Sequence, residues 1–355
     1  MRTTLWLTIG CAVLYSSGRG PAAATAGAPC TAATAACTEW VTLGGGPSRS
    51  MIYRTYPLEA RNDAVRRALI MVHGTNRNAD HYFTTATAAA FLGGALEDTV
   101  VIAPRFTACT DTLEPNEVAW SCNGDSWRSG GAAATHPQLS SFDLVDDILR
   151  ALAKKSVFPN LKAIVVAGHS AGGQFVSRYE MSNRVHDSLG VSVTYVVANP
   201  SSYAWPSATR PLPTADAAPD NAKGGWNTDR PHTTFSYGSF SSGACPNYDR
   251  WPAGLQNRTA GYTAKMSDEQ LKKQLVARPT TYLLGQVDTL PLGGFDSSCQ
   301  AMAQGATRRA RGEAFAKHVN EELGAKHAIR IVPECGHNDR CVYTTDAVLP
   351  MIFPR

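Results

Sequence analysis

Two glycines flank a serine in the pattern Gly-x-Ser-x-Gly, formed by Gly168, Ser170 and Gly172. An apolar run precedes the pattern at residues 163–166, and a segment able to begin a helix follows at residues 174–179. A chain that turns from a strand directly into a helix needs glycine on both sides of the serine, because a Cβ there would collide with neighbouring backbone. The hydroxyl then lies at the apex of the turn, beside backbone N–H groups that stabilise negative charge. The pattern therefore predicts that Ser170 is a nucleophile.

A serine hydroxyl becomes a strong nucleophile only beside a base, and the base needs an acid that orients it. Of the nine histidines, His337 lies just after a late apolar run, residues 328–332, in a loop between two closely spaced cysteines. Asp288 follows the preceding apolar run, residues 281–284. We therefore predict a catalytic triad in the chain order Ser170, Asp288 and His337, with His337 as the base.

Other acidic residues near the predicted base leave alternatives open. Asp296 and Glu334 also lie in loops of this part of the chain, and either is an alternative to Asp288 as the orienting acid. Asp339 is too near to His337 in the sequence to be the preferred partner.

Backbone N–H groups must also stabilise the oxyanion that forms when a serine attacks a carbonyl carbon, an effect worth about 3 kcal/mol per donor. Ala171, directly after the nucleophile, supplies the first donor. Thr75 is our candidate for the second, because it follows the apolar run 68–72 and because Gly74 lets the backbone approach the substrate closely. We expect His73 to form structural hydrogen bonds in this loop rather than to act in catalysis.

The segments that must position these residues are short apolar runs separated by helical segments. Residues 39–43 and 50–56 flank a glycine-rich turn and predict an entering hairpin. Further apolar runs lie at residues 68–72, 99–103, 164–167, 193–198, 281–284 and 328–332. Continuous apolar strands that alternate with helices indicate an α/β fold, with a mostly parallel central sheet and helices on both faces.

Two of the intervening helices have clear sequence patterns. Residues 142–152 place apolar side chains on one face of a helix. Residues 307–323 predict a second helix, and we expect Arg308, Arg309 and Arg311 to lie on its solvated face.

Residues 200–257 break the alternating pattern. They are rich in Pro, Gly, Ser and aromatic residues and have no apolar periodicity. A long irregular segment in a compact domain is usually a lid or a binding loop, so we interpret this one as a lid-like insertion over the active site. A polymer substrate needs an open apolar groove, and Trp251, Tyr203 and Trp205 are our candidates to line it.

The amino-terminal residues are typical of a secretory signal. A basic start precedes an apolar stretch, residues 5–15, that is too short to span a bilayer, and small residues follow it. We expect residues 1–26 to be a signal peptide and residues 27–355 to form a single domain that is periplasmic or secreted. Lipid attachment at Cys11 is an alternative.

The composition is that of a globular protein, with 43% hydrophobic and 17% charged residues in a chain of 355. Loss of the leader removes Arg2 and Arg19 and no acidic residue, which lowers the formal net charge from +4 to +2. A formal net charge this small does not indicate the basic surface that nucleic-acid-binding proteins carry. We expect a monomer without an integral membrane segment in the mature chain, acting on a polymeric or small-molecule carbonyl substrate.

Eight cysteines remain after the leader, and an even number in an exported chain implies disulfides. The zinc alternative lacks a Cys-x-x-Cys pair. Eight cysteines allow 105 pairings, and proximity suggests one of them. Short loops would join Cys30 with Cys37, Cys109 with Cys122 and Cys335 with Cys341, which leaves Cys245 with Cys299.

Taken together, the loop at residues 73–74, Ser170, Asp288 and His337 resemble the α/β-hydrolase fold over essentially the whole mature chain. Exported bacterial enzymes related to polyhydroxyalkanoate depolymerases share this layout. More narrowly, the sequence Gly-His-Ser-Ala-Gly-Gly-Gln-Phe at residues 168–175, the leader and the aromatic insertion are similar to oxidised polyvinyl alcohol hydrolases, which are β-diketone hydrolases.

This resemblance implies that a serine hydrolase cleaves the C–C bond of a β-diketone, giving a carboxylate and a methyl ketone through an acyl-serine intermediate. No metal or organic cofactor is implied. A carboxylesterase or a polyester depolymerase would use the same residues and is the rival interpretation. A hypothesis of another class is a non-catalytic binding protein on this fold, and the complete set Ser170, Asp288 and His337 argues against it.

Overall fold

The apolar runs of the sequence form an eight-stranded sheet in the order β1-β2-β4-β3-β5-β6-β9-β10. The computed structural model describes residues 27–354 except 125, 214–234, 241, 242, 244 and 259, so the predicted signal peptide and Cys11 lie outside the described residues. β2 pairs antiparallel with β1 and β4, and the other neighbouring strands of this sheet pair in parallel. The predicted hairpin and mostly parallel sheet are thereby confirmed. The strands are β1 (Thr38–Thr42), β2 (Arg49–Arg54), β3 (Arg67–Val72), β4 (Thr99–Pro104), β5 (Ala163–His169), β6 (Ser192–Ala198), β9 (Thr280–Gly285) and β10 (Ala328–Val332).

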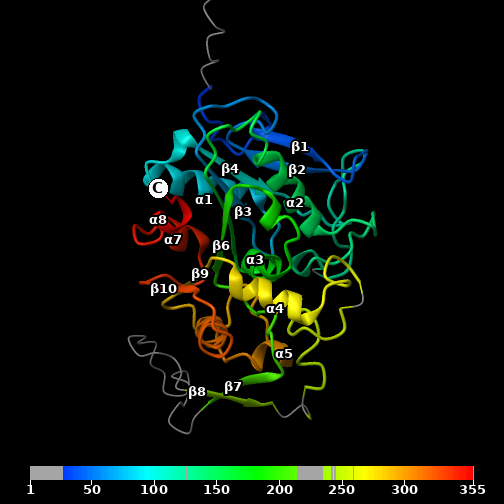
Figure 1. Cartoon of the computed structure of the whole chain (residues 1–355), viewed down its shortest axis with the longest axis vertical. Coiled ribbons are helices and arrows are strands. Elements are labelled where there is room, and N and C mark those ends of the chain that lie inside the picture. The colour runs from blue at the N-terminus through cyan, green and yellow to red at the C-terminus, as the bar shows by residue number, and fades with distance from the viewer. Residues whose placement is uncertain are drawn as a thin grey trace, which may run out of the picture.

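Helices cover both faces of this sheet, and the side chains of the strands alternate between two buried cores. Ile70 and Val166 point into one core, shared with α2, α3, α4 and α6, whereas Met71 and Val165 point into the other, shared with α1, α7 and α8. Figure 1 shows α7 and α8 beside α1, with α3 and α4 adjacent to each other. The helices are α1 (Ala79–Leu92), α2 (Ser141–Leu152), α3 (Ala171–Ser182), α4 (Asp268–Ala277), α5 (Cys299–Met302), α6 (Arg308–Lys317), α7 (Asp339–Thr344) and α8 (Leu349–Ile352).

The segment predicted as an insertion contributes a small separate sheet. β7 (Thr209–Pro213) and β8 (Phe235–Ser239) pair antiparallel, and they lie at the lower end of the molecule in Figure 1, away from β1 and β2. The predicted helix over residues 307–323 is α6 followed by a π-helical turn, His318–Glu322. Short 3-10 helices lie at Ala35–Cys37, Leu96–Asp98, Ser126–Ser129 and His186–Ser188.

The prediction that the arginines of α6 face solvent is wrong. Arg308, Arg309 and Arg311 are all buried. Each guanidinium donates to a backbone carbonyl oxygen of a neighbouring loop: Arg308 to Leu292, Arg309 to Gln286 and Arg311 to Gly305. We predicted exposed side chains because arginine is charged. These loops, however, provide enough carbonyl oxygens to accept the hydrogen bonds of a buried guanidinium group.

Four disulfides join the pairs that proximity suggested, Cys30–Cys37, Cys109–Cys122, Cys245–Cys299 and Cys335–Cys341. Four disulfides fit an exported protein, because such bonds persist in oxidising compartments. Among the described residues, no helix is long and apolar enough to cross a membrane.

A buried carboxyl group ties α2 to α3. Asp146 of α2 accepts hydrogen bonds from the hydroxyl of Tyr179 on α3, at 2.6 Å, and from that of Tyr262, at 2.8 Å. Burial raises the pKa of Asp146 from its ordinary value of 3.8 to about 6, although the two hydroxyls favour the charged form. Because the folded pKa lies above the unfolded one, this group stabilises the fold most below about pH 4, and the contribution is lost as the pH rises through about 6.

We expect Asp146→Asn to remove this pH dependence. The stability of the wild type relative to the variant should fall by about 2 kcal/mol between pH 4 and pH 7, measured as free energies of unfolding in urea. Asp147→Asn, on the same helix but at a partly exposed carboxylate, is the matched control and should run parallel to the wild type. A constant difference between wild type and Asp146→Asn across this range would contradict the assignment.

Candidate active site

Ser170 occupies a tight turn between β5 and α3. Its φ is +59°, a left-handed conformation that non-glycine residues rarely adopt. A Cβ on Gly168 would lie 2.3 Å from the carbonyl oxygen of Gly172, and a Cβ on Gly172 would lie 2.1 Å from that of Val72. Both glycines are therefore required by backbone packing, and the turn holds Ser170 where β5 ends.

The structure brings the three predicted triad residues into contact. His337 Nε2 lies 2.9 Å from Ser170 Oγ, and His337 Nδ1 lies 2.8 Å from Asp288 Oδ2. The Asp288 side chain is 2% exposed, so its carboxylate is shielded from water. In this arrangement Nδ1–H donates to the carboxylate while Nε2 accepts the hydroxyl proton of Ser170, which is the geometry that general-base activation of a serine needs.

The other candidate acids lie elsewhere. Asp296 accepts a hydrogen bond from the backbone N–H of Ser298, and Glu334 is exposed. Asp339 is bound by His81 Nε2, at 3.0 Å, and by the hydroxyl of Thr85. The carboxylate that contacts His337 is thus that of Asp288.

The two predicted oxyanion donors belong to segments beside Ser170. Ala171 is the first residue of α3, and Thr75 lines the same pocket as Ser170. A Cβ on Gly74 would lie 3.7 Å from Ser170 Cβ, so the loop after β3 runs directly past the serine. Within the described residues, neither the Ala171 nor the Thr75 N–H donates a hydrogen bond, which leaves both available to a ligand.

His73 has the structural role that the sequence predicts. The ring is fully buried, Nε2 accepts the backbone N–H of Phe106 at 3.1 Å, and Nδ1 lies 2.9 Å from the carbonyl oxygen of Gly74. Since Nε2 accepts, Nδ1 carries the proton and donates to Gly74. Burial lowers the pKa of His73 to about 4, so the ring is neutral. Its two hydrogen bonds hold the loop that carries Thr75 in place.

Two residues that the sequence analysis did not single out complete the surroundings of His337. Asn199, at the end of β6, donates to the carbonyl oxygen of Gly336 and accepts the N–H of Gly285, so it links the loops after β9 and β10. His169 lies between Asn199 and Tyr82, with its ring 4.7 Å from that of His337. Burial lowers the pKa of His169 well below its ordinary value, and the neighbouring positive charges lower it further, which keeps the ring neutral. The position of His169 directly before Ser170 was the feature of the sequence from which its place beside the site could have been predicted.

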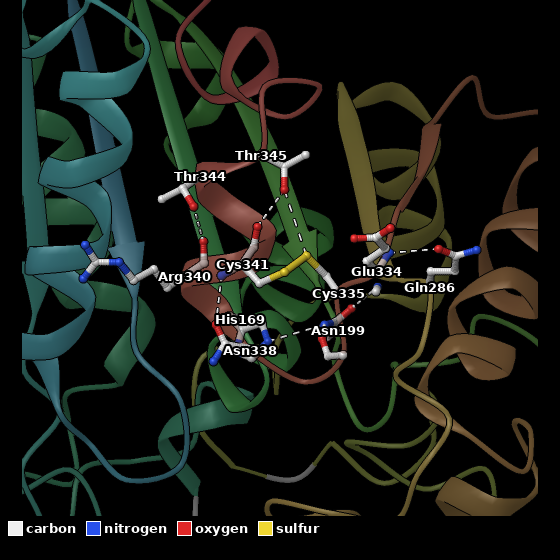
Figure 2. The surroundings of a disulfide bond; sticks show 12 residues. His169, Asn199, Gln286, Glu334, Cys335, Asn338, Arg340, Cys341, Thr344 and Thr345 are labelled. Carbon is white, nitrogen blue, oxygen red and sulfur yellow. Dashed lines mark hydrogen bonds between the residues drawn. A yellow bond between two sulfur atoms is a disulfide. The ribbon is translucent and has the colours of Figure 1, made fainter. Parts of the chain in front are cut away.

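Figure 2 shows how the loop after β10 is held. The Cys335–Cys341 disulfide joins the start of this loop to α7, with His169 and Asn199 beside it. Asn338 caps α7 by accepting the N–H of Cys341. His337 thus lies in a segment fixed at both ends by a covalent bond.

A pocket of about 390 Å³ opens at Ser170 and His337. Gly293 and Gly294 form one wall, and a Cβ on Gly293 would lie 3.5 Å from His337 Cδ2. Polar groups and apolar atoms line it in similar measure. The remaining side chains that line it, each of which carries a polar group, are Thr75, Asn76, Asn78, His81, Tyr82, His169 and Asp339. Among the described residues no three His, Cys, Asp or Glu side chains are grouped as metal ligands would be.

The prediction that aromatic residues of the insertion line the substrate groove is wrong for Tyr203 and Trp205. Both are 0% exposed, and they pack against Phe315 of α6 with ring centroids 4.3 and 5.5 Å away. Trp251 is partly exposed but lines a different pocket, and its indole N–H donates to the carbonyl oxygen of Ser129. These aromatic rings cover α6, which otherwise would expose its apolar side.

Comparison with known proteins identifies the family and the fold. Residues 69–349 match the model of the Alpha/beta hydrolase family. The chain belongs to the α/β-hydrolase family. No curated relative matches its sequence.

Two solved structures share the α/β-hydrolase fold of this chain. A poly(3-hydroxybutyrate) depolymerase from Bordetella parapertussis is 20% identical, with 86% of this chain and 88% of that one covered and a TM-score of 0.56. A poly(aspartic acid) hydrolase from Sphingomonas sp. KT-1 is 21% identical, with 89% and 98% covered and a TM-score of 0.57. The narrower likeness to oxidised polyvinyl alcohol hydrolases stays a prediction.

Removal of the Cys335–Cys341 bond is expected to impair catalysis more than folding. We expect the double variant Cys335→Ser/Cys341→Ser to lose roughly tenfold or more in kcat, because displacement of a catalytic group by about 1 Å can cost about a hundredfold. The control is Cys30→Ser/Cys37→Ser, which opens a similarly short loop that does not line the pocket. Steady-state kinetics and thermal unfolding of both variants provide the measurement, and an equal kcat in the two would contradict the expectation.

Proposed function

We propose that the protein is an exported serine hydrolase that cleaves the C–C bond of β-diketones in oxidised polyvinyl alcohol. The observation that carries the catalytic part is the continuous contact from Asp288 through His337 to Ser170. Ser170 is the nucleophile, His337 the general base and acid, and Asp288 the residue that orients the imidazole. The N–H groups of Ala171 and Thr75 form the oxyanion hole.

Attack begins when His337 Nε2 takes the proton of Ser170 and Oγ bonds to one carbonyl carbon of the diketone. The carbonyl π electrons move to its oxygen, where the two N–H donors stabilise the negative charge. Collapse re-forms the C=O bond and breaks the C–C bond to the central methylene carbon. The second carbonyl accepts these electrons as an enolate, and the imidazolium protonates its carbon to give a methyl ketone.

Water then completes the cycle. His337 takes a proton from water, the oxygen attacks the acyl carbon, and the second tetrahedral intermediate expels Ser170 Oγ, which recovers its proton from the imidazolium. The products are one carboxylate and one methyl ketone, and the net reaction consumes one water molecule. The same residues would hydrolyse an ester, because only the leaving group differs.

The pocket supports a hydrophilic substrate. The polar groups of its lining provide hydrogen-bond partners for the hydroxyl groups that alternate along a polyvinyl alcohol chain, and its apolar atoms can contact the carbon backbone of that chain. Both solved structures reported above are, by their names, enzymes that act on polymers. A carboxylesterase or polyester depolymerase with this site is the competing outcome.

The remaining parts of the proposal concern the setting of the enzyme. We propose that residues 1–26 direct export, that the mature enzyme is a periplasmic or secreted monomer, and that lipid attachment at Cys11 is the alternative. Residues 200–257 belong to this proposal as an insertion over the active site. The four disulfides support an oxidising compartment.

Product analysis distinguishes the two activities. We expect the purified protein to convert a small aliphatic β-diketone into equal amounts of carboxylate and methyl ketone, measured by NMR. Ser170→Ala should lose at least about a thousandfold of this activity, because the general base and the oxyanion hole then have no nucleophile to serve.

The control arm uses a polyhydroxyalkanoate film and a simple aliphatic ester under the same conditions. Ester hydrolysis without diketone cleavage would replace the proposal by the esterase interpretation. Full activity in Ser170→Ala would refute the nucleophile assignment.

A further inference from the structure

One buried arginine contacts both the triad acid and the loop that walls the pocket. The side chain of Arg308, the first residue of α6, is 0% exposed. Its Nη1 lies 3.4 Å from Asp288 Oδ1, and its Nη2 donates to the carbonyl oxygens of Leu292, at 2.7 Å, and Gly293, at 2.8 Å. Its Nε donates to Ser201 Oγ at 2.8 Å. Four hydrogen bonds use nearly all of the five N–H donors that a guanidinium has.

The contact with Asp288 complements the triad. Asp288 uses Oδ2 to accept from His337, and in the described part of the chain Arg308 is the residue whose side chain reaches Oδ1. A carboxylate held by one oxygen is free to rotate about its Cβ–Cγ bond, whereas one held at both oxygens has a fixed plane. The guanidinium also supplies the opposite charge that a buried carboxylate requires.

The contacts with Leu292 and Gly293 act on the pocket. Residues 292–295 run over His337 and Thr75, since a Cβ on Gly294 would lie 3.4 Å from Thr75 Cγ2. Residues 292–294 are exposed and include two glycines, so their position depends on the two hydrogen bonds from Arg308, together with the packing of the adjoining Phe295 ring against Arg308 and Arg311.

We propose that Arg308 is a positioning residue that fixes the orientation of the Asp288 carboxylate and the place of the 292–295 wall with one guanidinium group. The inference rests on the proposed triad. It couples the catalytic acid to the substrate pocket, so a change at Arg308 affects kcat through Asp288 and KM through the wall.

The chain offers a matched control in Arg311, one turn further along α6. Arg311 is equally buried and also donates to backbone carbonyl oxygens, those of Ser201 and Gly305. Both guanidinium groups lie over the ring of Phe295, but Arg308 alone of the two hydrogen-bonds Asp288 and the wall. A purely structural role would make the two arginines equivalent.

The test compares Arg308→Ala and Arg311→Ala on a small activated ester, with guanidinium chloride added at non-denaturing concentrations. We expect Arg308→Ala to lose roughly tenfold to a hundredfold in kcat and to raise KM several-fold. Added guanidinium should restore kcat in a saturable manner, and sodium chloride at equal ionic strength should not. Arg311→Ala removes a contact with Phe295 of the wall, so we expect lower thermal stability and a higher KM. It leaves the hydrogen bond from Arg308 to Asp288 intact, so it should show no loss of kcat that guanidinium restores.

Arg308→Lys decides the question if the alanine variant does not fold. Lysine keeps the charge but lacks the planar fork, so we expect a folded enzyme whose kcat is lower than that of the wild type. Wild-type kcat and KM in Arg308→Lys or Arg308→Ala, or equal losses without rescue in Arg308→Ala and Arg311→Ala, would overturn the inference. Failure of the proposed function is separate, because it shows as ester hydrolysis without diketone cleavage, as an active Ser170→Ala or as an inactive wild type.

Discussion

The structure depends on a tight turn in which backbone packing excludes a side chain at Gly168 and at Gly172, two residues before and two residues after Ser170. Residues held in left-handed conformations typically cost about 1–3 kcal/mol and persist only where the surroundings hold them in place. Here β5 is paired on both sides, with β3 and β6, and the first turn of α3 lies against the carbonyl oxygens at the end of β3. The sheet therefore holds Ser170 in its conformation, and α3 is anchored from its other side by the hydroxyl of Tyr179 on Asp146.

The partners of Ser170 are placed by the parallel register of the next strands. Val332, at the end of β10, pairs with Gly285, at the end of β9, so the loops that follow begin at the same edge of the sheet. Asn199 joins these loops, and Asp288, His337 and Thr75 thereby lie around Ser170. The charges are also constrained, because burial keeps His73 and His169 neutral and the buried Asp288 carboxylate forms an ion pair with Arg308.

Local signals in the sequence were enough for the strands, the turn at Ser170, the order of Asp288 and His337, and the disulfide pairs. The strands, the turn and three of the disulfides depend on residues close together in the chain, and the placement of Asp288 beside His337 depends on the rule that parallel strands end at one edge of a sheet. The cysteines of Cys245–Cys299 are 54 residues apart, and this pair remained by elimination. Arg308 and Asn199 could not be found in this way. Their partners come from distant loops, and nothing local distinguishes a guanidinium that meets backbone carbonyl oxygens from one that meets water.

The aromatic residues of the insertion illustrate the same limit and connect it to the site. An exposed, aromatic, irregular segment predicts a binding groove, yet Tyr203 is buried because α6 needs a cover for Phe315. Tyr203 lies two residues after Ser201, whose hydroxyl accepts a hydrogen bond from Arg308, so the chain that carries the buried ring also contacts the arginine beside Asp288. None of the described residues of the insertion lines the pocket at Ser170. Its lining comes instead from the segments that follow β3, β5, β9 and β10, because parallel strands end at the same edge of the sheet.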